Sequence, residues 1–302
     1  MRRNSFRTIS LLAIVAAISG CTTTQMNPAG EHSAESHAAG TPAAGAMVVS
    51  NPSLPAGEAD AMARLNSSPR HGEWAMVSTG PGDSVRAWVV YPERKTKAPI
   101  VIVVHEIYGL SPWIRAVADQ FAADGFLAVA PDFLTMKQIP EGSDSIRRQA
   151  MVAAIRTLNS ADVQRQISAI ANYAMALPAA LPRYGVVGFC WGGGVSFEHA
   201  VRAPALGASV VYYGTSPRSE TLSTVRAPVL GLYGGNDARV NATIPAADST
   251  LRTLGKVYSP IIYDGAGHGF LRQQAGANGA NLTATQKAWP ATIAWFRQHL
   301  GA

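Results

Sequence analysis

The segment Gly188-Phe189-Cys190-Trp191-Gly192-Gly193 decides the fold, because it places a reactive side chain on a sharp turn. It follows an apolar run at residues 184–189, which predicts a strand, and it precedes a stretch with helical spacing. Small residues on both sides of the turn let strand and helix approach closely. The segment therefore predicts a nucleophile elbow, with Cys190 in the position where serine is usual.

The helix that follows the elbow predicts an activated thiol at Cys190. Its free N–H groups and partial positive charge would point at the sulfur and favour thiolate over thiol. The same glycine pattern also fits a tight turn around a buried, inert cysteine. Residues elsewhere in the chain must distinguish these two interpretations.

From about residue 84 onward, predicted strands alternate with predicted helices. Such alternation favours the α/β class, with a mostly parallel sheet covered by helices on both faces. In such sheets, reactive side chains gather at the carboxyl ends of the strands. The expected strands are 84–92, 99–106, 126–132, 184–189, 208–214, 228–234 and 257–265; the expected helices are 111–125, 144–157, 161–177, the stretch after Cys190, 243–255 and 285–299.

Two further side chains follow predicted strands and complete a catalytic set. Asp237 comes after the strand at 228–234, and His268, flanked by glycines, comes after the strand at 257–265. Singly, Asp237 could be a turn former and His268 a surface residue. A carboxylate can, however, hold an imidazole in one tautomer and stabilise its charged form. In the chain order nucleophile, acid, histidine, the three residues predict the α/β-hydrolase fold and a Cys-His-Asp triad.

The residues after the strand at 99–104 predict an oxyanion hole. In this fold, the loop at that point supplies one backbone N–H, and the residue after the nucleophile supplies the other. The backbone amides of Ile107 and Trp191 occupy these two positions in the sequence.

Several of these segments resemble the dienelactone hydrolase family. They are HEIYG (105–109), APDF (130–133), RRQA (147–150), GFCWGG (188–193), GGND (234–237) and GHGFLR (267–272), and they extend over roughly residues 73–300. The resemblance implies hydrolysis of an ester or lactone through an acyl-cysteine, with no metal or organic cofactor. It also implies that Glu106 lies near the thiol and helps to deprotonate it when substrate binds; otherwise Glu106 is a salt-bridged loop carboxylate.

The resemblance further implies two arginines that bind an anionic lactone. Arg272, four residues after His268, matches one of them, and Arg147 is the assignment for the other, with Arg148 adjacent. Planar guanidinium groups suit a carboxylate because they bind it bidentately. The chain departs from the family at its N-terminus and at Met151 and Trp191, which we expect around the site.

The N-terminal residues predict export and lipidation. Residues 1–20 combine basic residues with a short apolar run and end just before Cys21, as in a bacterial lipoprotein signal. Acylated Cys21 would anchor the protein to the periplasmic face of a membrane, the outer membrane being favoured by family analogy. A plain secretory signal is the alternative. Residues 21–70, rich in Ala, Gly, Ser and Thr, predict a flexible tether, and residues 71–302 the catalytic domain.

Composition limits the partners. The net charge is +6, and three of the basic residues lie within residues 1–20, so nothing indicates a nucleic-acid partner. We expect a monomer that acts on a small ester or lactone. Alternatives are a general carboxylesterase or thioesterase of the cell envelope, and a non-catalytic envelope lipoprotein. A redox-active thiol is a weaker alternative, because no resolving cysteine accompanies Cys190.

Overall fold

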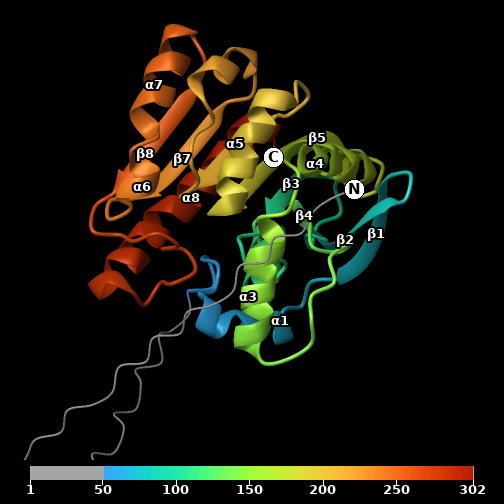
Figure 1. Cartoon of the computed structure of the whole chain (residues 1–302). Coiled ribbons are helices and arrows are strands. Elements are labelled where there is room, and N and C mark those ends of the chain that lie inside the picture. The colour runs from blue at the N-terminus through green and yellow to red at the C-terminus, as the bar shows by residue number, and fades with distance from the viewer. Residues whose placement is uncertain (1–50, 302) are drawn as a thin grey trace, which may run out of the picture. The chain divides into compact units, whose positions relative to one another are not determined.

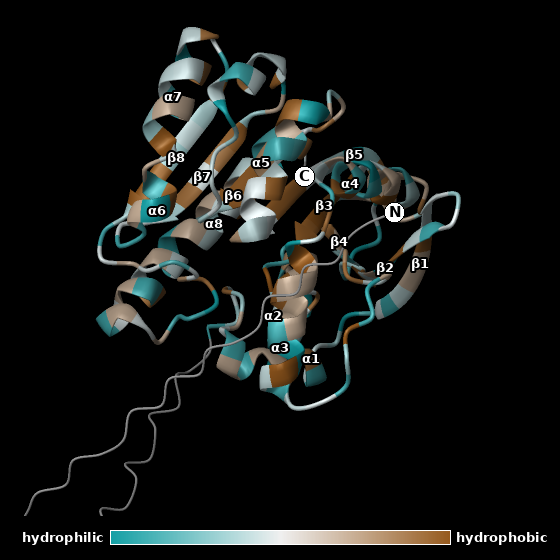
Figure 2. Cartoon of the chain, viewed as in Figure 1, coloured by the Kyte–Doolittle hydropathy of each residue, from teal (hydrophilic) through white to brown (hydrophobic). Residues whose placement is uncertain are grey.

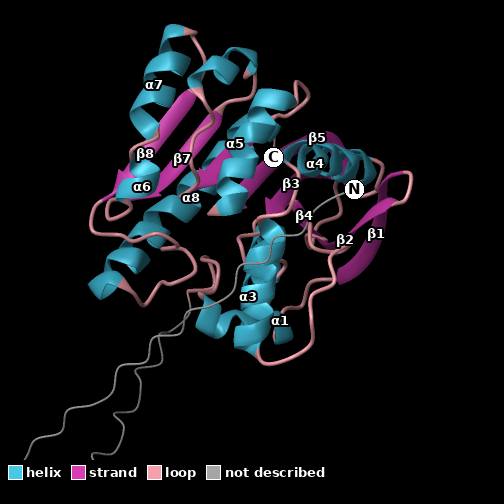
Figure 3. Ribbon diagram, viewed as in Figure 1, coloured by secondary structure: helices cyan, strands magenta, loops and turns pink. Residues whose placement is uncertain are grey.

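A single eight-stranded sheet forms the centre of the computed structural model, which describes residues 51–301 (Figures 1 and 3). Its strand order is β1-β2-β4-β3-β5-β6-β7-β8 for the strands β1 (Gly72–Gly80), β2 (Asp83–Val90), β3 (Ala98–Val104), β4 (Leu127–Asp132), β5 (Ala180–Phe189), β6 (Ala208–Tyr212), β7 (Val229–Gly234) and β8 (Tyr258–Tyr263). The pairs β1–β2 and β2–β4 are antiparallel, and all others are parallel. The predicted mostly parallel sheet is confirmed.

Helices cover both faces of this sheet. They are α1 (Ala61–Asn66), α2 (Pro112–Ala123), α3 (Asp144–Ile155), α4 (Ser160–Met175), α5 (Trp191–Arg202), α6 (Ala238–Asn241), α7 (Ile244–Thr253) and α8 (Ala280–Leu300), with short 3-10 helices η1 (Glu58–Asp60), η2 (Ser219–Thr224) and η3 (Ala277–Gly279). Buried side chains of α2 and α8 form one core cluster, and those of α4, α5 and α7 form a second. The expected layered α/β architecture is therefore present.

The two core clusters share the central strands. In β3, Val101 and Val103 face one cluster, whereas Ile100, Ile102 and Val104 face the other. Every residue of β3 is buried, and the central strands are hydrophobic in Figure 2. A strand buried on both faces is apolar throughout, which explains why the sequence showed a continuous run there.

Sequence signals located most helix ends well. Ser111 caps α2 by accepting a hydrogen bond from the Ile114 amide at 3.3 Å, and Gly125, just beyond its end, has a φ of +96°. Strand β1 was missed because it lies at the sheet edge, where Val77 and Thr79 are its only buried residues. Helix α8 starts five residues before the predicted helix at 285–299.

The predicted tether at 21–70 needs correction over residues 51–70. These residues belong to the same folded unit as the rest of the domain. The Trp113 indole N–H donates to the Ala56 carbonyl at 3.1 Å, and Arg70 binds Asp119 through two hydrogen bonds of 3.0 and 2.6 Å. The small-residue composition concealed apolar contacts, because Leu54 and Ala61 are buried against the core.

The predicted signal, the acylated Cys21 and the first part of the tether lie outside the described residues. Within residues 51–301, no helix combines the length and apolar character needed to cross a bilayer.

Candidate active site

The sequence-predicted side chains lie in loops at the carboxyl ends of neighbouring strands. Glu106 follows β3, Cys190 follows β5, Asp237 follows β7 and His268 follows β8. The chain proceeds from β3 to β4 in one direction along the sheet and from β5 to β6 in the other. Ligands of open α/β sheets bind where the strand order reverses in this way. The loops that carry Glu106 and Cys190 border that position.

Cys190 occupies a strained turn between β5 and α5. Its φ of +56° and ψ of −115° lie in a region that L-residues rarely adopt, and its amide donates to the Tyr212 carbonyl at 3.0 Å. A Cβ atom on Gly192 would lie 2.4 Å from the His105 carbonyl oxygen. Only glycine lets α5 start this close to β3, which confirms the predicted elbow geometry.

The surroundings of Cys190 favour its protonated form. Burial raises its pKa, and the charge of Glu106 raises it further, while the Trp191 backbone amide acts in the opposite direction. The helix terminus therefore contributes as the sequence suggested, but burial and a neighbouring carboxylate outweigh it. The direction of this pKa shift favours a thiol before substrate binds, the state in which the resemblance gives Glu106 its role.

His268 and Asp237 form a tight pair. The His268 Nδ1 and Asp237 Oδ2 atoms are 2.5 Å apart, and the buried Asp237 side chain also accepts from the Val240 amide at 3.4 Å. Because Nδ1 donates its proton to the carboxylate, Nε2 is left as the atom that can exchange a proton with a substrate. A Cβ on Gly234 would lie 2.6 Å from the Ala266 carbonyl, so glycine allows the two loops to meet.

Tyr213 is a residue of the site that the sequence analysis missed. It follows β6 with a φ of +41°, and its ring centroid lies 5.1 Å from that of His268. Its hydroxyl is buried without a hydrogen-bond partner among the described residues. Burial and the charges of Glu106 and Cys190 raise its pKa well above the usual range. Tyr213 lies at the end of the predicted strand 208–214, beside Gly214, and this position was the available sequence signal.

His105 fixes the loop that carries Glu106. The Phe133 amide donates to His105 Nε2 at 3.2 Å, so the proton lies on Nδ1, which donates to the Glu106 carbonyl at 2.7 Å. Complete burial lowers the pKa of this histidine, which keeps it neutral. Its ring also stacks on Trp191 at 5.5 Å. His105 thereby connects the loop after β3 to the elbow.

Glu106 is an acid whose charge depends on pH in the neutral range. Its side chain is 5% exposed, and burial raises its pKa to about 7 although the charge of Arg272 acts in the opposite direction. Arg272 Nε lies 3.1 Å from Glu106 Oε1, yet without the alignment of a hydrogen bond. The carboxylate is therefore paired electrostatically but is not locked in place.

The two arginines contact a carboxylate that the sequence analysis had placed in the tether. Arg272 Nη1 lies 2.5 Å from Glu58 Oε2, and Arg148 Nη2 lies 2.6 Å from Glu58 Oε1. The Tyr108 ring lies beside both guanidinium groups, at 5.3 and 5.1 Å from their central carbons. Arg147 joins none of these contacts, so the structure pairs Arg272 with the adjacent Arg148 instead.

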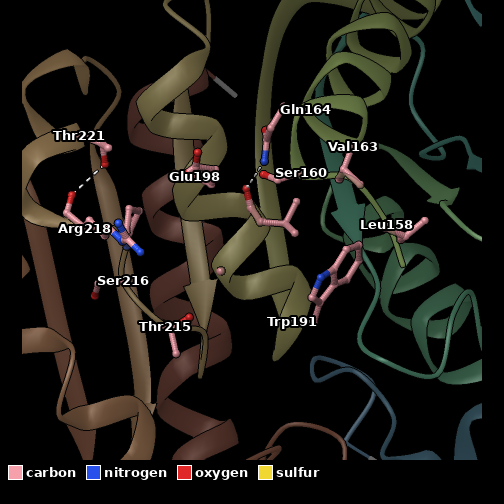
Figure 4. A pocket seen from close by; sticks show the side chains of 13 residues that line it. Leu158, Ser160, Val163, Gln164, Trp191, Glu198, Thr215, Ser216, Arg218 and Thr221 are labelled. Carbon is pink, nitrogen blue, oxygen red and sulfur yellow. Dashed lines mark hydrogen bonds between the residues drawn. The ribbon is translucent and has the colours of Figure 1, made fainter. Parts of the chain in front are cut away.

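Of the two amides expected to form the oxyanion hole, that of Ile107 lies in the loop after β3 and that of Trp191 belongs to the first residue of α5. Within residues 51–301, neither the Ile107 nor the Trp191 amide donates to a backbone carbonyl. Beside the elbow, a cavity of about 490 Å³ extends from Trp191 past Gly194 to Arg218 (Figure 4). Figure 4 shows Trp191 and Arg218 at opposite sides of this space.

The sheet order, the strained elbow and the residues that follow β7 and β8 define an α/β-hydrolase. More specifically, the chain belongs to the dienelactone hydrolase family, whose sequence model matches residues 85–300. It is accordingly an ester or lactone hydrolase. The recognition of this family from short motifs is confirmed.

Similar proteins agree with this assignment. A Yersinia pestis protein named "Putative carboxymethylenebutenolidase" is 30% identical over 250 residues, which cover 78% of this chain and 92% of that protein. A Bradyrhizobium protein named "Probable 2-oxo-3-(5-oxofuran-2-ylidene)propanoate lactonase" is also 30% identical, with 76% and 94% covered. The crystal structure of a "Putative Dienelactone Hydrolase" from Klebsiella pneumoniae superposes with a TM-score of 0.64 at 26% identity, covering 76% of this chain and 99% of that one.

Proposed function

We propose that the chain hydrolyses esters or lactones through an acyl-cysteine formed on Cys190. The observation that carries this proposal is the strained, positive-φ turn that presents Cys190, with a paired histidine and carboxylate on the loops of the same sheet edge. The names of the Yersinia and Bradyrhizobium relatives support a lactone or related ester as the substrate class. No cofactor is required for this chemistry.

The first half of the proposed cycle forms the acyl-enzyme. As substrate enters, the Glu106 carboxylate accepts the Cys190 proton, and the thiolate sulfur attacks the carbonyl carbon. The amides of Ile107 and Trp191 stabilise the oxyanion. The C–O bond of the leaving group then breaks, and its oxygen takes a proton from Nε2 of a charged His268, which Asp237 stabilises.

The second half releases the acid. Neutral His268 accepts a proton from water, and the resulting hydroxide attacks the acyl carbon. The carbon–sulfur bond breaks, and the Cys190 thiolate leaves. Glu106 then returns its proton to the sulfur, which restores the thiol, the carboxylate and the charged imidazole. The net reaction consumes one ester bond and one water.

The decisive experiment replaces the sulfur. We expect Cys190→Ala to abolish hydrolysis of p-nitrophenyl butyrate while circular dichroism stays unchanged, since the bond-forming atom is absent. Rapid quenching of the wild type with this ester should give a butyryl mass increase on the peptide that contains Cys190. Asp264→Asn, an exposed acid on the loop after β8, is the control and should leave the rate unchanged. Unaltered esterase activity in a folded Cys190→Ala protein would overturn the proposal.

We further propose that the enzyme works at the cell envelope, anchored through acylated Cys21. This rests on the order of basic residues, short apolar run and cysteine within residues 1–21. Two or more acyl chains give stable anchoring, whereas one gives only reversible binding.

A further inference from the structure

Glu58 bridges the guanidinium groups of Arg148 and Arg272. We propose that Glu58 is a specificity-determining residue: it fills the arginine pair of Arg148 and Arg272, so the site selects neutral esters or lactones over substrates that carry a carboxylate. This inference rests on the proposed hydrolase function and names the substrate class of the same site. It concerns a residue outside the segment, 85–300, that matches the family.

Both carboxylate oxygens of Glu58 are engaged. One lies 2.6 Å from Arg148 Nη2 and the other lies 2.5 Å from Arg272 Nη1. Two guanidinium groups that each hold one oxygen provide the arrangement by which proteins bind a carboxylate ligand. The Tyr108 ring borders the same pair of cations. A substrate carboxylate would therefore have to displace Glu58 before it could bind there.

Displacement is opposed by the way the backbone around Glu58 is held. The Glu58 amide donates to the Arg272 carbonyl at 2.9 Å, and the Gln274 side chain donates to the Pro55 carbonyl at 2.8 Å. Two residues before Glu58, Ala56 is buried and its carbonyl accepts from the Trp113 indole N–H. These contacts hold the backbone of residues 55–58 against the domain, so the position of Glu58 is fixed by the fold.

The charges of this group also balance. Arg148 and Arg272 supply two positive charges, and Glu58 supplies one negative charge. Glu106, 3.1 Å from Arg272, supplies a second negative charge when it is ionised. The group of four side chains therefore has a net charge of zero when Glu106 is ionised. When Glu106 is protonated, the net charge of the group is +1. Removing the Glu58 charge would raise either value by one.

The group is connected to the reacting atom. Arg272 contacts both Glu58 and Glu106, and the charge of Glu106 acts on the Cys190 thiol. A charge on a substrate group beside the arginine pair would therefore act on Glu106, and we expect it to influence the rate constant for capture, kcat/KM.

The test uses two pairs of esters that differ only in methylation of a distal carboxylate. They are 4-nitrophenyl hydrogen succinate with its methyl ester, and 4-acetoxybenzoate with its methyl ester. We expect the wild type to prefer the neutral member of at least one pair. In Glu58→Gln, kcat/KM for the anionic member should rise relative to the neutral one by on the order of tenfold, since one charge at ion-pair distance has been removed. High salt should reduce this gain.

A matched control lies two residues away. Asp60→Asn removes the same charge from the same 3-10 helix, at an exposed side chain without a hydrogen-bond or ion-pair partner among the described residues. This control should leave the ratio of the two esters unchanged. Adding Arg272→Gln to Glu58→Gln should abolish the gain, because the exposed cation is then missing.

Binding of benzoate, measured by calorimetry, gives a readout independent of turnover. We expect Glu58→Gln to bind benzoate on the order of tenfold more tightly than the wild type. If the wild type cleaves no ester, the proposed function fails while the benzoate result still decides this inference. If esters are cleaved but Glu58→Gln changes neither the ester ratio nor benzoate binding by more than about twofold, the specificity role is wrong.

Discussion

Glu106 links the protonation of the site to the stability of the fold. Burial holds its pKa at about 7, against 4.5 for the exposed side chain, so the folded protein binds this proton more tightly than the unfolded chain does. The contribution of Glu106 to the free energy of unfolding is fully present below pH 4.5 and is lost as the pH rises through 7. The difference between the two pKa values corresponds to about 3 kcal/mol.

Replacing Glu106 with glutamine should remove this dependence on pH. The free energy of unfolding of Glu106→Gln, measured in urea relative to the wild type, should increase by about 3 kcal/mol between pH 4.5 and pH 8. Glu141→Gln, at an exposed position, should show no comparable change. Parallel pH profiles for wild type and Glu106→Gln would contradict the assignment of the titrating group.

Individual residues of the site differ in how well the sequence predicted them. Cys190, Asp237 and His268 were predicted because each sits in a glycine-rich turn after an apolar run, which is a local signal. The sequence did not decide between Arg147 and Arg148. Adjacent helix positions point about 100° apart, so the decision depends on knowing which face of the helix lies inward. Helix α3 buries only Ile155, so its sequence shows little of which face lies inward.

At the scale of elements, the start of α5 is shaped by how closely it approaches β6. A Cβ atom on Gly193 would lie 2.6 Å from the Tyr212 carbonyl oxygen. This distance is too short for a real contact, so the backbone of α5 or of β6 would have to move. On Gly194, the next residue of the same helix, the nearest atom would be Thr215 Oγ1 at 3.5 Å, an ordinary contact. The two neighbouring glycines therefore serve different purposes.

Alanine at these two positions should have opposite effects. Gly193→Ala should lower the free energy of unfolding by about 3 kcal/mol, because it overpacks a backbone contact. Gly194→Ala should raise it by about 0.5–1 kcal/mol, because alanine stabilises a helix interior relative to glycine. Urea denaturation of both variants measures this difference. Equal changes in the two variants would show that the approach of α5 to β6 does not depend on Gly193.

The elements themselves were predicted where hydrophobic patterns are local. The buried runs of β3 to β7 and the capped ends of α2 follow from the sequence. The sequence did not predict that residues 51–70 are folded. Their few apolar side chains show no sustained periodicity, and they are buried only through packing in the core cluster that contains α2. Glu58 was missed for the same reason: its partners are defined by the tertiary fold, not by any neighbouring sequence.

At the scale of the whole molecule, the correction of the domain boundary shortens the connection to the proposed anchor. Residue 51 already belongs to the folded unit, so about thirty residues separate it from Cys21. A chain of that length extends to at most roughly 100 Å. If Cys21 is anchored, residue 51 would therefore stay within that distance of the membrane surface.

The anchor itself can be tested in a Gram-negative host that expresses the full chain. We expect the wild type to partition into the detergent phase of Triton X-114 and Cys21→Ala to move to the aqueous phase, because the variant cannot be acylated. The ester hydrolysis of the two proteins should be equal, since Cys21 lies outside the catalytic domain. Recovery of both proteins in the aqueous phase would contradict lipid anchoring.

The contacts of Glu58 also set the order in which the site is completed. Its partners Arg148 and Arg272 follow it by 90 and 214 positions in the chain. During synthesis the carboxylate emerges first, and the second guanidinium is among the last side chains to appear. Closing so long a loop is entropically costly and belongs to the end of folding. A chain interrupted between residues 190 and 268 would therefore carry the thiol of Cys190 but neither His268 nor Arg272, so the proposed catalysis and the proposed selectivity would both require the later residues.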